Sequence, residues 1–131
     1  MKKPSASPSL RVFLVENHRD TLLYMQMYLE SLGHKVSTAE TMAAALEALS
    51  GAAWDVLISD IGLPDGTGWE LLQRAALPPG VYCIAMSGFG MGADHVRSRE
   101  AGYRHHLLKP FNPAELDRML EEAAQEKQGK S

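Results

Sequence analysis

Short apolar runs alternate with amphipathic stretches along most of the chain. Five runs are short enough to be strands: Leu10–Val15, Lys35–Ala39, Val56–Asp60, Tyr82–Met86 and His105–Leu108. Between them lie stretches typical of helices: Arg19–Leu32, Thr41–Leu49, Trp69–Ala76 and Ala93–Ala101. A last helix is predicted after the final strand, because three residues suit an N-cap, a first helical position and a capping box: Asn112, Pro113 and Glu115.

These elements form five βα units in succession. Helices of this length between apolar strands imply parallel pairing through right-handed crossovers. The sequence therefore predicts an α/β fold, a doubly wound five-stranded parallel sheet with five helices. At 131 residues we expect one domain at 10–124, between a disordered N-terminal arm at 1–9 and a frayed C-terminal tail at 125–131.

Composition excludes several classes of function. A net charge of −3, with no basic stripe along any predicted helix, argues against nucleic-acid binding. No segment approaches the roughly 20 apolar residues of a membrane span, and the N-terminus lacks the apolar core of a signal peptide. The single cysteine, Cys83, lies in an apolar run, where we expect a buried thiol in a reducing compartment. These features predict a cytoplasmic protein that binds neither nucleic acid nor membrane.

Polar side chains stand at the carboxyl ends of four predicted strands. Asp60 ends the third strand and leads into a loop rich in proline and glycine. Glu16 and Asn17 follow the first strand, Ser87 follows the fourth and Lys109 the fifth. Because an open parallel sheet builds its sites at the carboxyl ends of its strands, we expect these side chains to converge.

The chemistry of this group is that of phosphoryl transfer. Carboxylate and carbonyl oxygens bind Mg²⁺, which prefers oxygen ligands and often takes a phosphate as a further one. A carboxylate such as Asp60 can attack a phosphoryl group and form an aspartyl-phosphate. Lys109 and a hydroxyl donor can hold the transferred oxygens. The arrangement therefore predicts phosphorylation of Asp60, with Mg²⁺ and Lys109 neutralising the developing charge.

Four motifs carry a resemblance to a known family. They are Leu14-Val15-Glu16-Asn17, Asp60 with Leu63-Pro64-Asp65-Gly66 behind it, Met86-Ser87-Gly88 and Leu108-Lys109-Pro110-Phe111. In this order and on these elements, the chain resembles the receiver domain of two-component response regulators over roughly residues 10–124. The resemblance implies the (βα)5 flavodoxin-like receiver fold and a signalling domain that is not an enzyme.

The resemblance also implies a role for each strand-end residue. Asp60 would be the phospho-acceptor, served by a phosphohistidine on a histidine kinase or phosphotransfer protein. The Mg²⁺ shell would consist of Glu16, Asn17, Asp60 and the backbone carbonyl of Gly62. The switch and phosphoryl-binding residues would be Ser87, Lys109 and His106, with a cis peptide between Lys109 and Pro110. The downstream protein partner is unknown, and we expect a monomer or a weak dimer.

Two residues depart from the family pattern. Asn17 stands where the family usually has an acid that ligates Mg²⁺, so we expect weaker cation binding. It keeps open an alternative function, a degenerate receiver that is never phosphorylated and acts only as a protein-interaction module. His106 stands where the family often has an aromatic ring that turns inward on activation, and its charge would make switching depend on pH. The run from Gly102 to Pro110 is similar to receivers of hybrid histidine kinases.

Other α/β functions fit the sequence less well. A phosphohydrolase with an aspartyl nucleophile would need a second acid where Gly62 stands. A flavin carrier would need a hydroxyl-rich loop after the first strand, where Glu16-Asn17-His18-Arg19 has the wrong charge. Gly88–Ala93 matches the dinucleotide pattern G-x-G-x-x-G/A, but it follows the fourth strand instead of the first. We interpret it as a loop that closes over Ser87.

Overall fold

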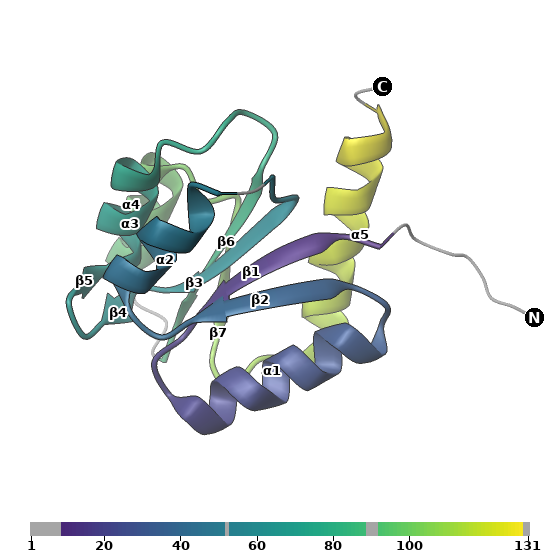
Figure 1. Ribbon diagram of the computed structural model, residues 1–131, viewed down its shortest axis with the longest axis horizontal. Coiled ribbons are helices and arrows are strands. Elements are labelled where there is room, and N and C mark those ends of the chain that lie inside the picture. The colour runs from purple at the N-terminus through teal and green to yellow at the C-terminus, as the bar shows by residue number, and fades with distance from the viewer. Residues whose placement is uncertain (1–8, 52, 89–91, 130–131) are drawn as a thin grey trace, which may run out of the picture.

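Five parallel strands form the centre of the molecule. The structure, a computed structural model, describes residues 9–51, 53–88 and 92–129. The strands are β1 (Arg11–Val15), β2 (Lys35–Ala39), β3 (Val56–Asp60), β6 (Tyr82–Ser87) and β7 (His105–Leu108). They pair in the order β2-β1-β3-β6-β7, each pair parallel (Figure 1). A separate antiparallel pair follows β3, made of β4 (Gly62–Leu63) and β5 (Gly66–Thr67).

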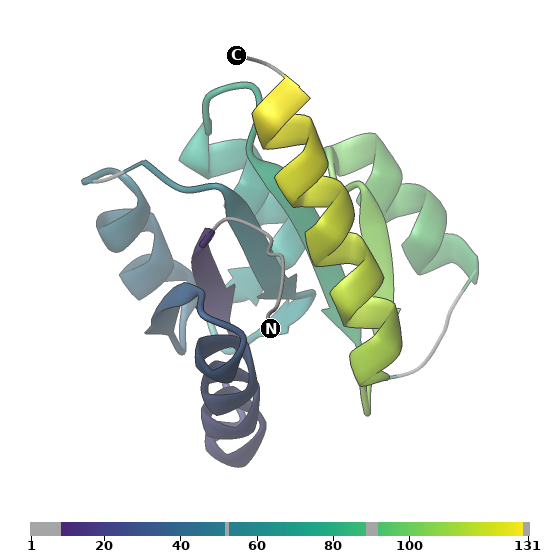
Figure 2. The ribbon, with the colours of Figure 1, turned by 90° about the vertical axis from the view of Figure 1, so that its right-hand side faces the viewer.

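Helices cover both faces of this sheet. They are α1 (Arg19–Ser31), α2 (Met42–Leu49), α3 (Gly68–Ala75), α4 (Gly92–Ala101) and α5 (Pro113–Gly129). Helices α1 and α5 lie on one face, and α2, α3 and α4 lie on the other (Figure 1, Figure 2). The doubly wound α/β fold with five parallel strands and five helices, predicted from the sequence, is confirmed.

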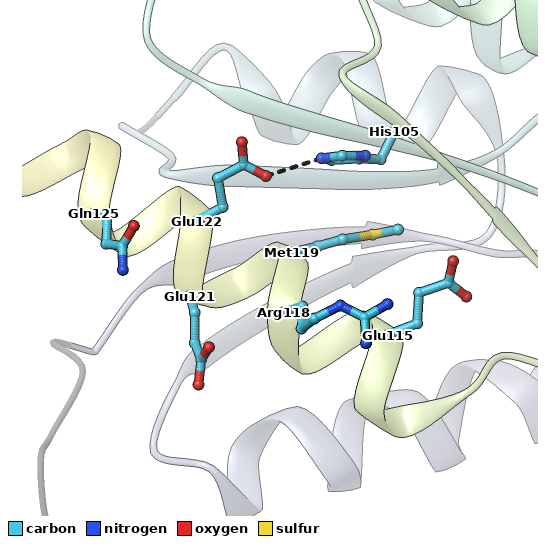
Figure 3. A pocket seen from close by; sticks show the side chains of 7 residues that line it. All are labelled: His105, Glu115, Arg118, Met119, Glu121, Glu122 and Gln125. Atoms are coloured by element: carbon cyan, nitrogen blue, oxygen red, sulfur yellow. Dashed lines mark hydrogen bonds and ion pairs between the residues drawn. The ribbon is translucent and has the colours of Figure 1, made fainter.

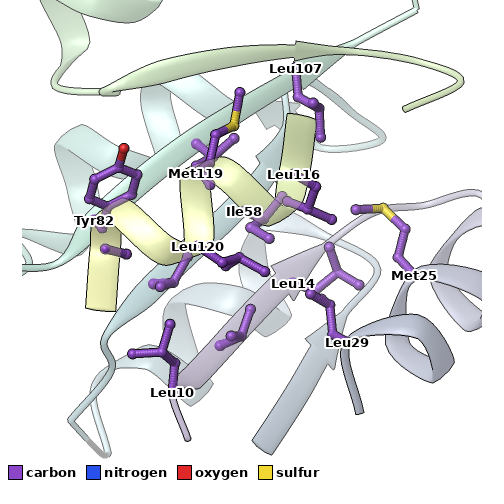
Figure 4. Packing of buried hydrophobic residues seen from close by; sticks show 14 of the residues in the cluster. Leu10, Leu14, Met25, Leu29, Ile58, Tyr82, Leu107, Leu116, Met119 and Leu120 are labelled. Atoms are coloured by element: carbon purple, nitrogen blue, oxygen red, sulfur yellow. The ribbon is translucent and has the colours of Figure 1, made fainter. Parts of the chain in front are cut away.

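The two faces of the sheet carry separate hydrophobic cores. Successive residues of a strand point to opposite faces. Leu14 of β1 therefore packs with Leu29 of α1 and Leu116 of α5 (Figure 4). The preceding Phe13 packs on the other face, in the cluster that contains Leu71 of α3. Because both faces are buried, the inner strands have nearly continuous apolar sequences.

Side-chain caps set where three of the helices begin. Thr41 and Thr67 precede α2 and α3, and their hydroxyl oxygens accept helix N–H groups at 3.1 and 3.0 Å. The cap at Thr67 starts α3 at Gly68, one residue before the predicted Trp69. Asn112 caps α5 as predicted, because its Oδ1 accepts a helix N–H at 2.9 Å.

Helix α5 continues to Gly129, past the limit at residue 124 that the sequence suggested for the folded domain. Lys127 Nζ donates to Asp55 Oδ2 at 3.1 Å, and the Arg104 guanidinium donates to both carboxylate oxygens of Glu126 at 2.8 and 2.6 Å. These contacts join the end of α5 to the segments that precede β3 and β7. Residues 1–8 of the predicted arm, 130–131 of the predicted tail and 89–91 of the predicted closing loop lie outside the described residues.

The start of α3 depends on a glycine. A Cβ on Gly68 would lie 2.7 Å from the carbonyl oxygen of Asp60 and 3.2 Å from the Cα of Ile61, so the backbone would have to move. We expect Gly68→Ala to lower the free energy of unfolding by about 1–3 kcal/mol, measured by chemical denaturation. The control is Gly51→Ala, whose Cβ would meet only a carbonyl oxygen at 3.9 Å. Equal denaturation midpoints for the two variants would contradict this account.

Candidate functional site

Three predicted site residues meet at the carboxyl edge of the sheet. Asp60 ends β3, Glu16 follows β1 and Lys109 follows β7. The Lys109 ammonium donates to Asp60 Oδ2 at 2.8 Å and to the two Glu16 oxygens at 3.1 and 3.4 Å. Both carboxylates are buried, the Glu16 side chain completely. The strand ends therefore bring these side chains together as the sequence predicted.

Backbone contacts fix the position of Asp60. The N–H of Gly62 donates to Asp60 Oδ1 at 3.2 Å, so each carboxylate oxygen has a different donor. The N–H of Gly68 donates to the carbonyl of Ile61 at 2.7 Å. This bond joins the two ends of the segment that contains β4 and β5, next to the end of β3. The predicted cis peptide between Lys109 and Pro110 is present after β7. No contact in the structure tests the predicted role of the Gly62 carbonyl.

Burial and charge act on Asp60 in opposite directions. Burial raises the pKa of the Asp60 carboxyl above its ordinary value of 3.8, and the neighbouring Glu16 charge raises it further. The hydrogen bond from Lys109 lowers the pKa of Asp60 but does not cancel the rise. Burial alone would lower the pKa of Lys109, yet its hydrogen bonds and charge contacts with both carboxylates raise it. The lysine is therefore held in its charged form.

Asn17 and His18 complete the edge next to Glu16. Asn17 Oδ1 is buried and accepts no hydrogen bond within the described part of the chain. His18 contacts Glu16 Oε2 twice, through its backbone N–H and its ring Nδ1, both at 3.0 Å. Glu16, His18 and Asp60 offer ligand atoms that all lie within 4.8 Å of one another. The donor set fits a divalent cation, because two carboxylates lie close together and Asn17, the residue after Glu16, has a buried amide oxygen without a donor.

His18 was not predicted from the sequence as part of this site. Its side chain can reach a strand-end carboxylate two residues away, which is the signal that could have identified it. The structure places His18 at the N-cap position of α1, and no side chain caps this helix.

Ser87 belongs to a hydrogen-bonded chain that runs through His106 into the space between α3 and α4. Ser87 Oγ lies 2.7 Å from His106 Nε2, and His106 Nδ1 lies 3.3 Å from Ser98 Oγ. Trp69 Nε1 donates to Ser98 Oγ at 2.9 Å. The ring of His95 stacks on His106, with centroids 4.1 Å apart and planes within 9°. The structure therefore connects two predicted residues, Ser87 and His106, to α3 through contacts that the sequence did not reveal.

Two hollows lie beside α5, outside the cluster of Asp60, Glu16 and Lys109, which we call the Asp60 cluster. One, of about 400 Å³, is lined by His105, Glu115, Arg118, Met119, Glu121, Glu122 and Gln125. Figure 3 shows Glu122 reaching toward His105, whose Nε2 lies 3.0 Å from its carboxylate. The other hollow, of about 620 Å³, lies between α4, β7 and α5 and includes His106 in its lining. The described side chains of Val96 and Leu108 are exposed on the elements that border it.

Fold and site together define a class of protein: a (βα)5 domain whose buried carboxylates, lysine and hydroxyl meet at the carboxyl edge of the sheet. The response regulator receiver domain family matches residues 12–121, and the chain belongs to this family. Receiver domains are signalling domains of two-component systems and accept a phosphoryl group. Receivers bind Mg²⁺ in their acidic pocket and interact with histidine kinases or phosphotransfer proteins.

The sequence relatives include both hybrid sensors and response regulators. The virulence sensor protein BvgS of Bordetella pertussis is 36% identical over 124 residues, which cover 88% of this chain and 10% of that protein. The transcriptional regulatory protein KdpE of Escherichia coli is 31% identical over 109 residues, covering 83% of this chain and 48% of KdpE. The chain thus spans about a tenth of the first relative and about half of the second.

Solved structures support the same family. A CheY-like receiver of Methanospirillum hungatei has a TM-score of 0.87 and 29% identity, covering 95% of this chain and all of that one. The receiver of a sensor histidine kinase of Pseudomonas aeruginosa has a TM-score of 0.80 and 26% identity, covering 90% of this chain and 99% of that one. That second structure holds a magnesium ion in its active-site cleft.

Within residues 9–51, 53–88 and 92–129, no helix is long and apolar enough to cross a membrane.

The raised pKa of Asp60 has a measurable consequence for stability. A carboxyl whose pKa is higher in the folded state costs stability once the pH rises above its ordinary pKa, 3.8 for Asp60. We therefore expect Asp60→Asn to raise the melting temperature at pH 7. The gain should shrink as the pH falls and vanish below 3.8, where Asp60 is neutral in both states.

Asp65 provides a control, because its pKa is lowered where that of Asp60 is raised. Its substitution should therefore change the melting temperature in the opposite direction. Its carboxylate accepts the N–H groups of Ala43 and Met42 at the start of α2, and these bonds lower the pKa of Asp65. Asp65→Asn should therefore lower the melting temperature at pH 7, and this loss should fade as the pH falls through the lowered pKa. Thermal melts from pH 3 to pH 7 test both variants. Destabilisation by Asp60→Asn at pH 7 would contradict the electrostatic account.

Proposed function

We propose that Asp60 is the phospho-acceptor of this receiver domain. The observation that carries the proposal is the Lys109 ammonium, which bridges Asp60 and Glu16 at the carboxyl edge of the sheet. Lys109 and the Gly62 N–H hold one Asp60 oxygen each, so the carboxylate has a fixed orientation toward the loops. A fixed carboxylate beside a fixed positive charge is the arrangement that attack on a phosphoryl group requires.

The transfer follows from these contacts. An Asp60 oxygen forms a bond to phosphorus as the bond between phosphorus and the donor histidine nitrogen breaks. Lys109 neutralises negative charge on the phosphoryl oxygens, and the Ser87 hydroxyl donates to one of them. Glu16, Asn17, Asp60 and the Gly62 carbonyl would hold Mg²⁺, which would supply further charge neutralisation. The donor would be a histidine kinase or a phosphotransfer protein, as for other receivers.

The output surface in this proposal is the face made by α4, β7 and α5. Ser87 ends β6 and contacts His106 of β7, so a hydroxyl drawn toward Asp60 must exchange this partner. Movement of His106 would reshape the hollow of about 620 Å³ that it lines. Phosphorylation would thereby change the affinity of this face for a downstream protein. The buried Cys83 thiol, whose pKa burial raises to about 12, agrees with the cytoplasmic location that we also propose.

Phosphorylation of Asp60 can be tested directly. We expect the protein with Mg²⁺ and acetyl phosphate to gain the mass of one phosphoryl group, and Asp60→Asn to gain none. Asn17→Asp should bind Mg²⁺ roughly tenfold more tightly, because it adds a negative charge beside the cation. Intact mass measures the adduct, and calorimetric titration measures Mg²⁺ affinity.

The same experiment separates the proposal from the degenerate alternative. An adduct on the wild-type protein that is absent from Asp60→Asn supports phosphorylation. An adduct that forms only on Asn17→Asp would indicate a degenerate receiver. No adduct with any donor, and no amide shift around Ser87 with beryllofluoride, would overturn the proposal for both forms.

The chain from Ser87 to Trp69 predicts an optical signal. A phosphoryl group that draws Ser87 away from His106 frees the ring to move, and Ser98 transmits the change to the Trp69 indole N–H. The measurement uses Trp54→Phe, which leaves Trp69 as the single tryptophan of the sequence. We expect beryllofluoride to change Trp69 emission in proportion to the occupied fraction of sites.

Ser98→Ala in the same background is the matched control. It removes the buried hydroxyl between Trp69 and His106 and leaves the Asp60 cluster intact. We expect this variant to bind beryllofluoride but to lose most of the emission change. An unchanged response in Ser98→Ala, or no response in its parent while the Asp60 adduct forms, would contradict transmission through Ser98.

A further inference from the structure

His18 places an imidazole at the mouth of the Asp60 cluster. Its Nδ1 lies 3.0 Å from Glu16 Oε2, and its side chain is 69% exposed while that of Glu16 is 0% exposed. The ring therefore stands at the border between a buried carboxylate and solvent. Neither the proposed phosphoryl transfer nor the switch uses this ring.

The atoms around His18 match a single-cation site. One nitrogen of His18 and one oxygen each of Glu16 and Asp60 lie within 4.8 Å of one another, and the described residues contain no other such cluster. Asn17 Oδ1 is an independent indication, because a buried carbonyl oxygen without a donor costs free energy unless something binds it. One oxygen each from Glu16 and Asp60 and one nitrogen from His18 form the cluster, and Asn17, the residue between Glu16 and His18, would add an amide oxygen.

The net negative charge of the cluster is small. Glu16 and Asp60 carry two negative charges, and the Lys109 ammonium that contacts both offsets one of them. Asn17 adds none. Mg²⁺ is a hard cation that gains little from an imidazole ligand. First-row transition metals bind imidazole well, and their affinity for a given nitrogen and oxygen site rises along the series toward copper.

We propose that His18 makes this site selective for a divalent first-row transition metal over Mg²⁺, with Glu16, Asn17 and Asp60 as the oxygen ligands. The proposal rests on the proposed function, because the cation would lie beside the acceptor carboxylate. A carboxylate only accepts hydrogen bonds, so in the contact with Glu16 the His18 proton is on Nδ1. Ligation through Nδ1 requires the proton on Nε2, and the metal then takes the place of the proton between the two side chains.

Cobalt(II) is the probe for this ligation. In water, a cobalt-bound imidazole gives a strongly shifted N–H resonance in the proton NMR spectrum. We expect this resonance in the wild-type protein and its loss in His18→Ala and His18→Gln. Calorimetric titration should show that both variants bind Co²⁺ roughly tenfold or more weakly, while their Mg²⁺ affinity stays the same. Thermal melts show that the variants remain folded.

His105→Gln is the matched control variant. His105 also lies 3.0 Å from a carboxylate, that of Glu122, but this pair is not part of a described metal-binding cluster. Its loss should leave the Co²⁺ affinity and the shifted resonance unchanged. Equal Co²⁺ affinity in the wild type and His18→Ala would overturn the proposal, as would a wild type that binds Mg²⁺ more tightly than Co²⁺. An Asp60 adduct formed with Mg²⁺ alone would in either case leave the proposed function standing.

Discussion

The ammonium of Lys109 between Glu16 and Asp60 is the contact on which the rest of the site depends. Two buried carboxylates at the same edge of a sheet repel each other and lose their hydration, and a single cation within 2.8–3.4 Å offsets part of both costs. The three residues come from β1, β3 and β7, so the cluster exists only when these strands stand in the observed order. The site therefore depends directly on the strand order of the fold.

This arrangement costs stability, which the two cores supply. The raised pKa of Asp60 means that its charged form is held against a preference for the proton. Large side chains such as Phe13 and Leu14, completely buried on opposite faces of β1, give the sheet the rigidity that keeps Glu16 in place at its end.

The sequence predicted the parts of the site that topology determines and missed those that side-chain geometry determines. Asp60 and Lys109 were predictable because parallel strands end at the same edge, whatever their separation along the chain. The bond from Trp69 to Ser98 joins residues on two helices, and no periodicity signals which rotamers meet. The helical end of α5 was not predicted for a related reason. Lys127 contacts Asp55, which is distant in the sequence, so no local pattern indicates the contact.

A histidine contact accompanies both departures from the family pattern. Asn17 lacks the charge of an acid, and the ring of the adjacent His18 contacts Glu16 Oε2 at 3.0 Å. His106 stands where the family often has an aromatic ring, and its two nitrogens contact Ser87 and Ser98. A ring held by hydrogen bonds can move by exchanging partners, at a net cost of about 1 kcal/mol for each bond.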